Sequence, residues 1–252
     1  MKIRIKFAKE GTMKFIGHLD MMRYFQKAMR RADVDIRYSE GFSPHQIMSF
    51  AAPLGVGITS RGEYVDIEVL STGSSAEMVR RLNAVMAEGV QVLSYKKLPD
   101  SAAAAMSIVA AADYTVLFRE GYEPEDWDDF AGGLSDFMRK EQILIMKKTK
   151  KGEKEIDIRP WIYWLKTDSS RSQKAEDGES LTDFGHRIRM EVAAGSAANL
   201  KPELVIQAYM ESRSQELDQF ALMIHRDEVY GNRAESGEPY LCPLDQFGED
   251  IE

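Results

Sequence analysis

Side chains able to do chemistry gather in two short stretches near the N-terminus. The first contains His18 and Asp20, and the second contains Glu40 and His45. An imidazole titrates near neutral pH, so either histidine could serve as a general acid or base, with a carboxylate orienting it. Histidines and carboxylates also ligate metals, but no multi-ligand spacing motif joins these four, and we predict no metal. His18, Asp20, Glu40 and His45 are therefore the candidate catalytic residues.

The second stretch belongs to a loop between two strand-like segments. Gly41 permits a backbone angle that other residues avoid, and Pro44 fixes its own. A rigid loop that carries a hydroxyl, a carboxylate and an imidazole favours a functional site, because scaffolds often place functional groups on loops. The alternative is an irregular connection whose polar groups satisfy their own backbone. The residues of this motif loop are Tyr38, Ser39, Glu40, Gly41, Phe42, Pro44 and His45.

Positive charge is concentrated in the same part of the chain. The net charge is −8, but residues 1–50 hold ten cations and five anions, which leaves +5 there and −13 elsewhere. Four cations recur at i, i+4, i+7 and i+8 on one predicted helix, either as a solvated face or as a phosphate-contacting face. A basic hairpin tip near residue 150 is a second candidate contact. The candidate nucleic-acid-binding residues are Arg23, Lys27, Arg30, Arg31, Arg37, Lys147, Lys150 and Lys151.

The first hundred residues predict a βαββαβ order. Alternating apolar residues indicate a strand over 2–8, and a helix follows Gly17, with an apolar stripe of Phe15, Leu19, Met22, Phe25 and Met29. A second strand is predicted to start at 36–38 and to resume at 47–50 after the loop. Further strands are predicted at 63–70 and 90–95, and Ser74 opens a second helix that ends at Gly89. This order is typical of a ferredoxin-like module over residues 1–99.

The second half repeats the pattern. Strands are predicted at 114–118, 143–146, 156–158, 186–192 and 220–229, and helices begin near Glu123 and Lys201. The helix after Glu123 has a core stripe of Trp127, Phe130, Leu134 and Phe137. Residues 167–183 lack periodicity and indicate a mobile polar loop, and the tail after Tyr230 is expected to be irregular. We therefore predict an α+β fold of two ferredoxin-like modules in tandem, 1–99 and 100–252.

Composition excludes several classes of protein. The chain is 44% hydrophobic and 29% charged, as in an ordinary globular protein. No apolar run approaches a membrane span, and the N-terminus alternates like a strand instead of resembling a signal peptide. The single Cys242 excludes an internal disulfide and a cysteine-ligated cluster, so we predict no cofactor. Cytoplasm is the expected location.

Several short motifs together resemble a known bacterial family. They are Phe15-Ile-Gly-His-Leu-Asp20 with Arg23, Tyr38-Ser-Glu-Gly-Phe-Ser-Pro-His45, Ser49-Phe50, Pro53-Leu-Gly-Val56, Gly62-Glu63 with Asp66, Ile156-Asp-Ile-Arg-Pro160 and Leu200-Lys-Pro-Glu-Leu204. The chain resembles the radical SAM-associated family, DUF2344, although Gly17 stands where a serine is common. The resemblance implies a radical SAM iron–sulfur protein as partner. It does not imply that this chain itself binds the cluster.

Three functions follow as hypotheses. The first is a non-catalytic accessory protein that binds RNA, such as tRNA or rRNA, and presents it to the radical SAM partner. The second is a hydrolase or nuclease that uses His18 and His45 for acid–base or metal-assisted chemistry, oriented by Asp20 or Glu40. The third is a protein-interaction subunit without nucleic acid. The first agrees best with the positive N-terminal part and the rigid loop.

Overall fold

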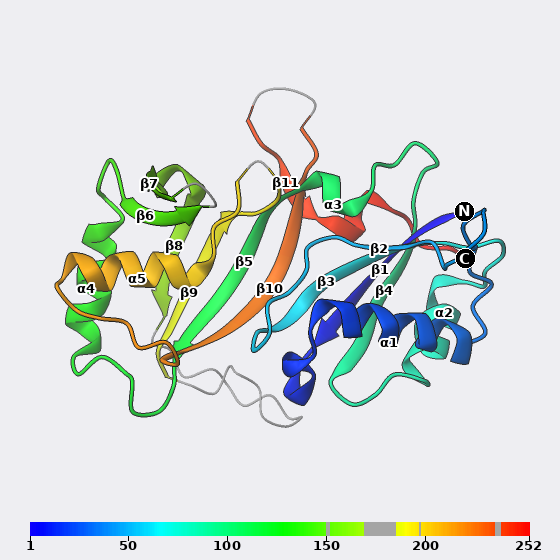
Figure 1. Ribbon diagram of the computed structural model, residues 1–252, viewed down its shortest axis with the longest axis horizontal. Helices are drawn as coiled ribbons and strands as arrows, with labels where there is room; N and C mark the ends of the chain where they lie inside the picture. The colour runs from blue at the N-terminus through cyan, green and yellow to red at the C-terminus, as the bar shows by residue number, and fades with distance from the viewer. Residues whose placement is uncertain (150–151, 169–184, 197, 235–237) are drawn as a thin grey trace. The chain divides into compact units, whose positions relative to one another are not determined.

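The computed structural model describes residues 1–149, 152–168, 185–196, 198–234 and 238–252 (Figure 1). It shows a mixed α+β fold with a large, mostly antiparallel sheet and several helices. Two compact units divide the chain. Unit 1 comprises Met1–Ala111 and Arg226–Glu252, and unit 2 comprises Ala112–His225. The division differs from the predicted boundary at residue 99, because the last 27 residues return to unit 1.

Unit 1 begins with a strand, a 3-10 turn and a helix, and its strands form an antiparallel sheet. The strand order is β4-β1-β3, and both β2 and β10 also neighbour β3. β10 (Leu222–Asn232) enters the unit at Arg226. The remaining elements are β1 (Lys2–Lys9), η1 (Gly11–Phe15), α1 (His18–Arg31), β2 (Met48–Phe50), β3 (Thr59–Glu68), α2 (Ser75–Asn83), β4 (Val90–Lys97), α3 (Ala105–Ile108), β11 (Leu241–Pro243) and η4 (Leu244–Phe247).

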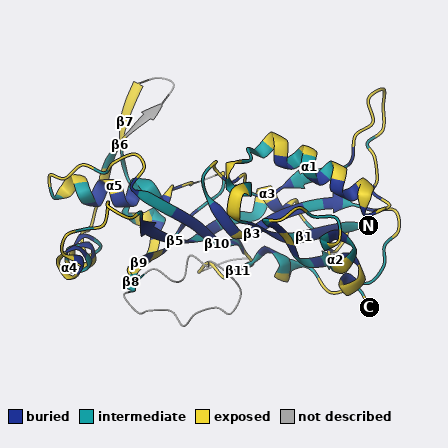
Figure 2. Ribbon diagram, turned by 90° about the horizontal axis from the view of Figure 1, so that it is seen from below, coloured by how far each residue is buried: buried dark blue, intermediate teal, exposed yellow. Residues whose placement is uncertain are grey.

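The apolar core of unit 1 lies between the sheet and helices α1 and α2 (Figure 2). Alternate residues of β1 point into it, together with Phe25 and Met29 from α1. The predicted stripe is wrong at its start, since Phe15 and Leu19 are 63% and 62% exposed. Phe15 belongs to the separate turn η1, which buries no residue, and Met21 takes the inward position on α1 instead.

The C-terminal tail covers the opposite face of the unit 1 sheet. The sequence predicts an irregular tail, but β11 pairs with β10 and the following turn η4 buries Leu244 completely. Arg4, whose side chain points away from the α1 face, donates a hydrogen bond of 3.1 Å to the Leu244 carbonyl. The tail therefore supplies apolar cover and a hydrogen-bond acceptor for a buried side chain of the unit 1 sheet.

Unit 2 contains the strand order β5-β9-β8, with β10 beside β5. The predicted stripe of α4 is confirmed, since all four of its residues are buried, and Asp126 caps the helix by accepting from the Asp129 amide. Its elements are β5 (Val109–Phe118), α4 (Trp127–Phe137), β6 (Leu144–Thr149), β7 (Gly152–Asp157), η2 (Arg159–Trp161), β8 (Ile162–Asp168), β9 (Arg187–Ala193) and α5 (Pro202–Ser212). β6 and β7 form a separate hairpin.

Two predictions for unit 2 fall mainly outside the described residues. Lys150 and Lys151 at the hairpin tip are not described, and neither is the side chain of Lys147 on β6. The polar segment predicted over 167–183 begins as the end of β8, and its remainder is not described. Among the described helices, none is long and apolar enough to cross a membrane.

Candidate functional site

The motif loop is the turn of a short hairpin arm, residues 37–47, which we call the arm. Its stem is paired: the Ile47 amide donates to the Arg37 carbonyl at 2.9 Å, and the Ser39 amide donates to the His45 carbonyl at 2.8 Å. Gly41 at the turn has φ +107°, so its left-handed conformation agrees with the sequence prediction. The arm is thus a defined local structure.

Polar side chains within the arm stabilise one another. The Ser39 hydroxyl lies 2.8 Å from His45 Nδ1 and also accepts a hydrogen bond from the His45 amide at 3.1 Å. These hydrogen bonds are those expected of a loop whose polar groups satisfy one another. The aromatic side chains of the arm are not covered: Phe42 is fully exposed and Tyr38 is 45% exposed.

Gln46 attaches the arm to the middle of α1. Its side-chain amide is buried and donates to the Gln26 carbonyl at 3.3 Å, and it lies 3.4 Å from the Tyr38 hydroxyl. Arg30 donates through Nε to the same Gln26 carbonyl at 3.3 Å. The base of the arm and a cation of α1 therefore meet at one backbone group.

The predicted cations of unit 1 are all exposed, but some of them form ion pairs with carboxylates and others do not. Arg23 pairs with Asp20 at 3.1 Å, and Arg37 pairs with Glu68 at 3.2 Å. Arg31 donates to the Val85 carbonyl at 3.0 Å. In the part of the chain that is described, no carboxylate forms an ion pair with Lys27, Arg30 or Arg31. These three are the cations of α1 best able to contact an anionic ligand.

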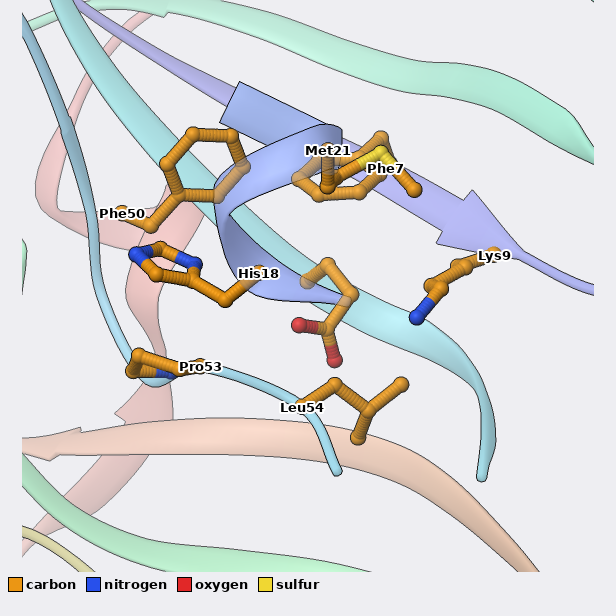
Figure 3. Close-up of a pocket in the computed structure, with 8 residues that line it drawn as sticks. Phe7, Lys9, His18, Met21, Phe50, Pro53 and Leu54 are labelled. Atoms are coloured by element: carbon orange, nitrogen blue, oxygen red, sulfur yellow. The ribbon is translucent and has the colours of Figure 1, made fainter. Parts of the chain in front are cut away.

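A small pocket lies at the first turn of α1 (Figure 3). The predicted residue His18 lines it, and its ring meets the Phe50 ring edge-on at 5.4 Å. Two charged residues that we did not single out by sequence, Lys9 and Glu63, line it as well. Glu63 belongs to a recognised motif, whereas Lys9 is the last residue of β1 and its sequence gives no distinguishing signal. The other lining residues are Phe7, Met21, Phe50, Pro53 and Leu54.

The charges in this pocket are deeply buried. Glu63 and Arg226 form an ion pair with an Nη2–Oε1 distance of 2.7 Å, and both side chains are only 5% exposed. Arg226 also donates to the Ala52 carbonyl at 2.6 Å. Lys9 is 3% exposed and donates to the Ile16 carbonyl at 2.7 Å. Burial lowers the pKa of Lys9, Glu63 opposes this effect, and Arg226 adds to it.

The four candidate catalytic residues lie in two places. His18 lines the pocket, and Asp20 is exposed on α1. Glu40 and His45 belong to the arm. No hydrogen bond joins His18 to Glu40 or His45 among the described residues, and those residues contain no group of three side chains suited to a metal ion. Among the described residues, no hydrogen bond or ion pair therefore links the two on α1 with the two in the arm.

The comparisons with known proteins identify the family of the chain. The model of DUF2344, described as an uncharacterized protein conserved in bacteria, matches residues 2–202, and the chain belongs to this family. No curated protein matches it. A chain from the crystal structure of a Cbf5-Nop10-Gar1 complex is similar at 10% identity and a TM-score of 0.43, covering 90% of this chain and 48% of that chain. The present chain thus spans about half the length of that solved chain.

Proposed function

We propose that the protein is a non-catalytic accessory protein that binds RNA through the arm and the exposed basic surface of α1. The attachment of the arm to α1 at the Gln26 carbonyl is the observation that supports this proposal most directly. It brings Arg30 to the base of an arm whose tip is a fully exposed aromatic ring. An arm with an exposed ring at its tip and a cation at its base suits a single-stranded nucleic acid, because bases stack on aromatic rings while cations contact the phosphates.

Presentation of RNA to a radical SAM enzyme is the second part of the proposal, and the cytoplasm is its expected setting. It rests on the family resemblance of the motifs in the arm and at the start of α1. The partner would carry the iron–sulfur cluster, since the chain has one cysteine. Co-purification of an iron–sulfur protein with the tagged chain tests this part, and recovery of RNA without such a protein would contradict it.

We further propose that both units are ferredoxin-like modules. In unit 1, the order β1-α1-β2-β3-α2-β4 accompanies a sheet in which β1 lies between β4 and β3, with β2 against β3. In unit 2, β5-α4-β8-β9-α5-β10 accompanies the sheet order β10-β5-β9-β8, with the β6–β7 hairpin inserted. Both patterns are compatible with a split βαβ topology. An experimental structure with another strand order would contradict this assignment.

RNA binding is testable with a substitution at the tip of the arm. Phe42→Ser should weaken the binding of single-stranded RNA about tenfold, since one stacked base is worth roughly 1–3 kcal/mol. Fluorescence anisotropy with labelled oligonucleotides measures this change. Phe220→Ser is the matched control, because Phe220 is an aromatic residue of unit 2 that is 65% exposed. Equal affinity of the Phe42 variant and the wild type would contradict the proposed contact.

The charge contribution needs a separate experiment. Each lost phosphate contact should lower the salt dependence of binding, so Lys27→Met combined with Arg30→Met should reduce the slope of log K against log salt by up to about 2. Lys97→Met removes an exposed cation elsewhere in unit 1 and serves as the control. A wild-type affinity that does not vary with salt would contradict phosphate contacts altogether.

The two alternative functions make different predictions. A hydrolase or nuclease that uses His45 would lose turnover in a His45→Ala variant that keeps its fold. A protein-interaction subunit would recover its partner from cells without RNA. RNA binding is the conclusion we favour, because it uses both the exposed ring at the tip of the arm and Arg30 at its base.

A further inference from the structure

The exposed face of α1 extends from the attachment of the arm to the start of the helix. Leu19, Arg23 and Lys27 follow one another at intervals of four residues, so they lie in one row on the helix. Arg30 comes three residues after Lys27 and continues this row. All four residues are exposed, and Figure 2 shows exposed residues along this helix. We call these four residues the α1 row.

The charge of this face is opposite to that of the whole chain. The exposed residues of α1 include four cations and one carboxylate, Asp20, whereas the chain has a net charge of −8. On α4, by contrast, the exposed charged residues are all acidic: Asp128, Asp129 and Asp136. Charge complementarity therefore favours an anionic partner for α1.

A second exposed aromatic ring precedes the start of α1. Phe15 ends η1 and is 63% exposed, and the Lys14 ammonium lies 5.3 Å from the centre of its ring. Only Ile16 and Gly17 separate Phe15 from α1, so its backbone lies within roughly 10 Å of the first turn. The arm is attached at Gln26, which is about 12 Å along the helix axis from the first residue of α1. Exposed rings thus belong to both ends of this stretch.

We propose that one unpaired RNA strand lies along the α1 row from the arm to Phe15, and that a base stacks on the Phe15 ring. This inference rests on the proposed function and adds the path and the length of the bound strand. The strand is unpaired, because a base inside a duplex is not free to stack on a protein ring. Its phosphates face the cations of the row, and Arg23 exchanges Asp20 for a phosphate. At the spacing of about 3.4 Å per nucleotide found in a duplex, the stretch of α1 between its start and the arm corresponds to roughly four nucleotides.

Labelled single-stranded RNA of about twelve nucleotides, compared with a duplex of the same length, tests the second stacking site by fluorescence anisotropy. Phe15→Ser should weaken the binding of the single strand about tenfold and leave the binding of the duplex unchanged. Phe220→Ser in unit 2 is the control and should bind like the wild type. If Phe42→Ser weakens binding but Phe15→Ser does not, this inference alone is overturned. If neither variant changes binding, the proposed function fails as well.

Asp20→Asn tests the path along the row through a gain of affinity, which a merely structural role of this residue would not produce. Loss of the carboxylate frees Arg23, so the single strand should bind about threefold more tightly, with a salt slope steeper by up to about 1. Asp128→Asn on α4 is the matched control, and circular dichroism checks that each variant folds.

Unchanged or weaker binding by a folded Asp20 variant overturns the proposed path. Equal binding of oligoglutamate and of RNA would identify an acidic peptide as the occupant and overturn it too.

Discussion

Glu63 and Asp66, two carboxylates on β3, each hold a buried arginine in unit 1. Glu63 binds Arg226, and Asp66 binds Arg4 through two hydrogen bonds of 2.8 and 2.9 Å. These residues belong to the Gly62-Glu63…Asp66 motif. Because a buried charge is tolerated only with a partner, the motif has a structural reason in addition to any functional one.

Removing one partner of the buried pair should destabilise the protein. Arg226→Met leaves Glu63 buried without its cation, and we expect a loss of about 3 kcal/mol in the free energy of unfolding. Urea denaturation measures this loss. In the matched double variant, Glu63→Gln with Arg226→Met, much of the stability should return because no charge is left unpaired. A single variant as stable as the wild type would contradict the assignment.

A carboxyl pair in unit 2 should make stability depend on pH. Burial and the neighbouring Asp113, which is also a hydrogen-bond partner, raise the pKa of Glu191 to about 7. The folded protein therefore holds a proton that the unfolded chain releases near its ordinary pKa of about 4.3. The stability from this proton is complete below that value and is lost as the pH rises through about 7.

Glu191→Gln should remove much of this dependence. The amide mimics the protonated carboxyl, so the decrease in unfolding free energy between about pH 5 and about pH 8 should shrink by on the order of 2 kcal/mol. Thermal denaturation across this range measures it. The same decrease in the variant and the wild type would show that Glu191 is not the titrating group.

At the scale of elements, the close approach of β3 and β10 depends on a glycine. A Cβ at Gly62 would lie 2.4 Å from the Glu228 Cα and 2.9 Å from the Asp227 carbonyl oxygen. Backbone atoms cannot move aside as a flexible side chain can, so the two strands would have to separate. Gly62→Ala should cost about 1–3 kcal/mol by overpacking. Chemical denaturation and the spectrum of the folded state measure this effect.

Gly132→Ala is the matched control for that substitution. Gly132 lies inside α4, and an added Cβ would meet no atom within 4 Å. Alanine is the better helix former there, by about 1 kcal/mol, so this variant should be neutral or more stable. Equal loss in both variants would mean that the close approach at Gly62 does not limit stability.

The sequence predicted secondary structure well where residues close together in the chain determine it. The stripe of α4, the Gly17 start of α1 and the left-handed Gly41 are local features, and the structure agrees with each. The exposure of Phe15 and Leu19 was missed because η1 breaks the helical period before α1 begins. The charged surroundings of Lys9 were missed for another reason: Glu63 and Arg226, whose charges act on it, lie 163 positions apart in the sequence.

At the scale of the molecule, the chain leaves unit 1 at Ala111 and returns at Arg226. A linear sequence pattern does not show this return, and the predicted boundary at residue 99 therefore omits the tail. The returning segment supplies the partners of three buried groups in unit 1. Arg226 pairs with Glu63, Glu228 accepts from the Tyr64 hydroxyl at 2.7 Å, and Leu244 accepts from Arg4.

A fragment of residues 1–111 should therefore fail to fold cooperatively, because it would bury Glu63 and Tyr64 without their partners and lacks the cover of Leu244. Joining residues 226–252 to it through a flexible Gly/Ser linker of about ten residues should restore a single cooperative transition in urea. A joined protein with Arg226→Met should then be less stable than the joined parent, which separates the ion pair from the apolar cover. If residues 1–111 unfold cooperatively with the same midpoint as the joined protein, the returning segment contributes nothing to unit 1, and the shorter domain predicted from sequence is the better description.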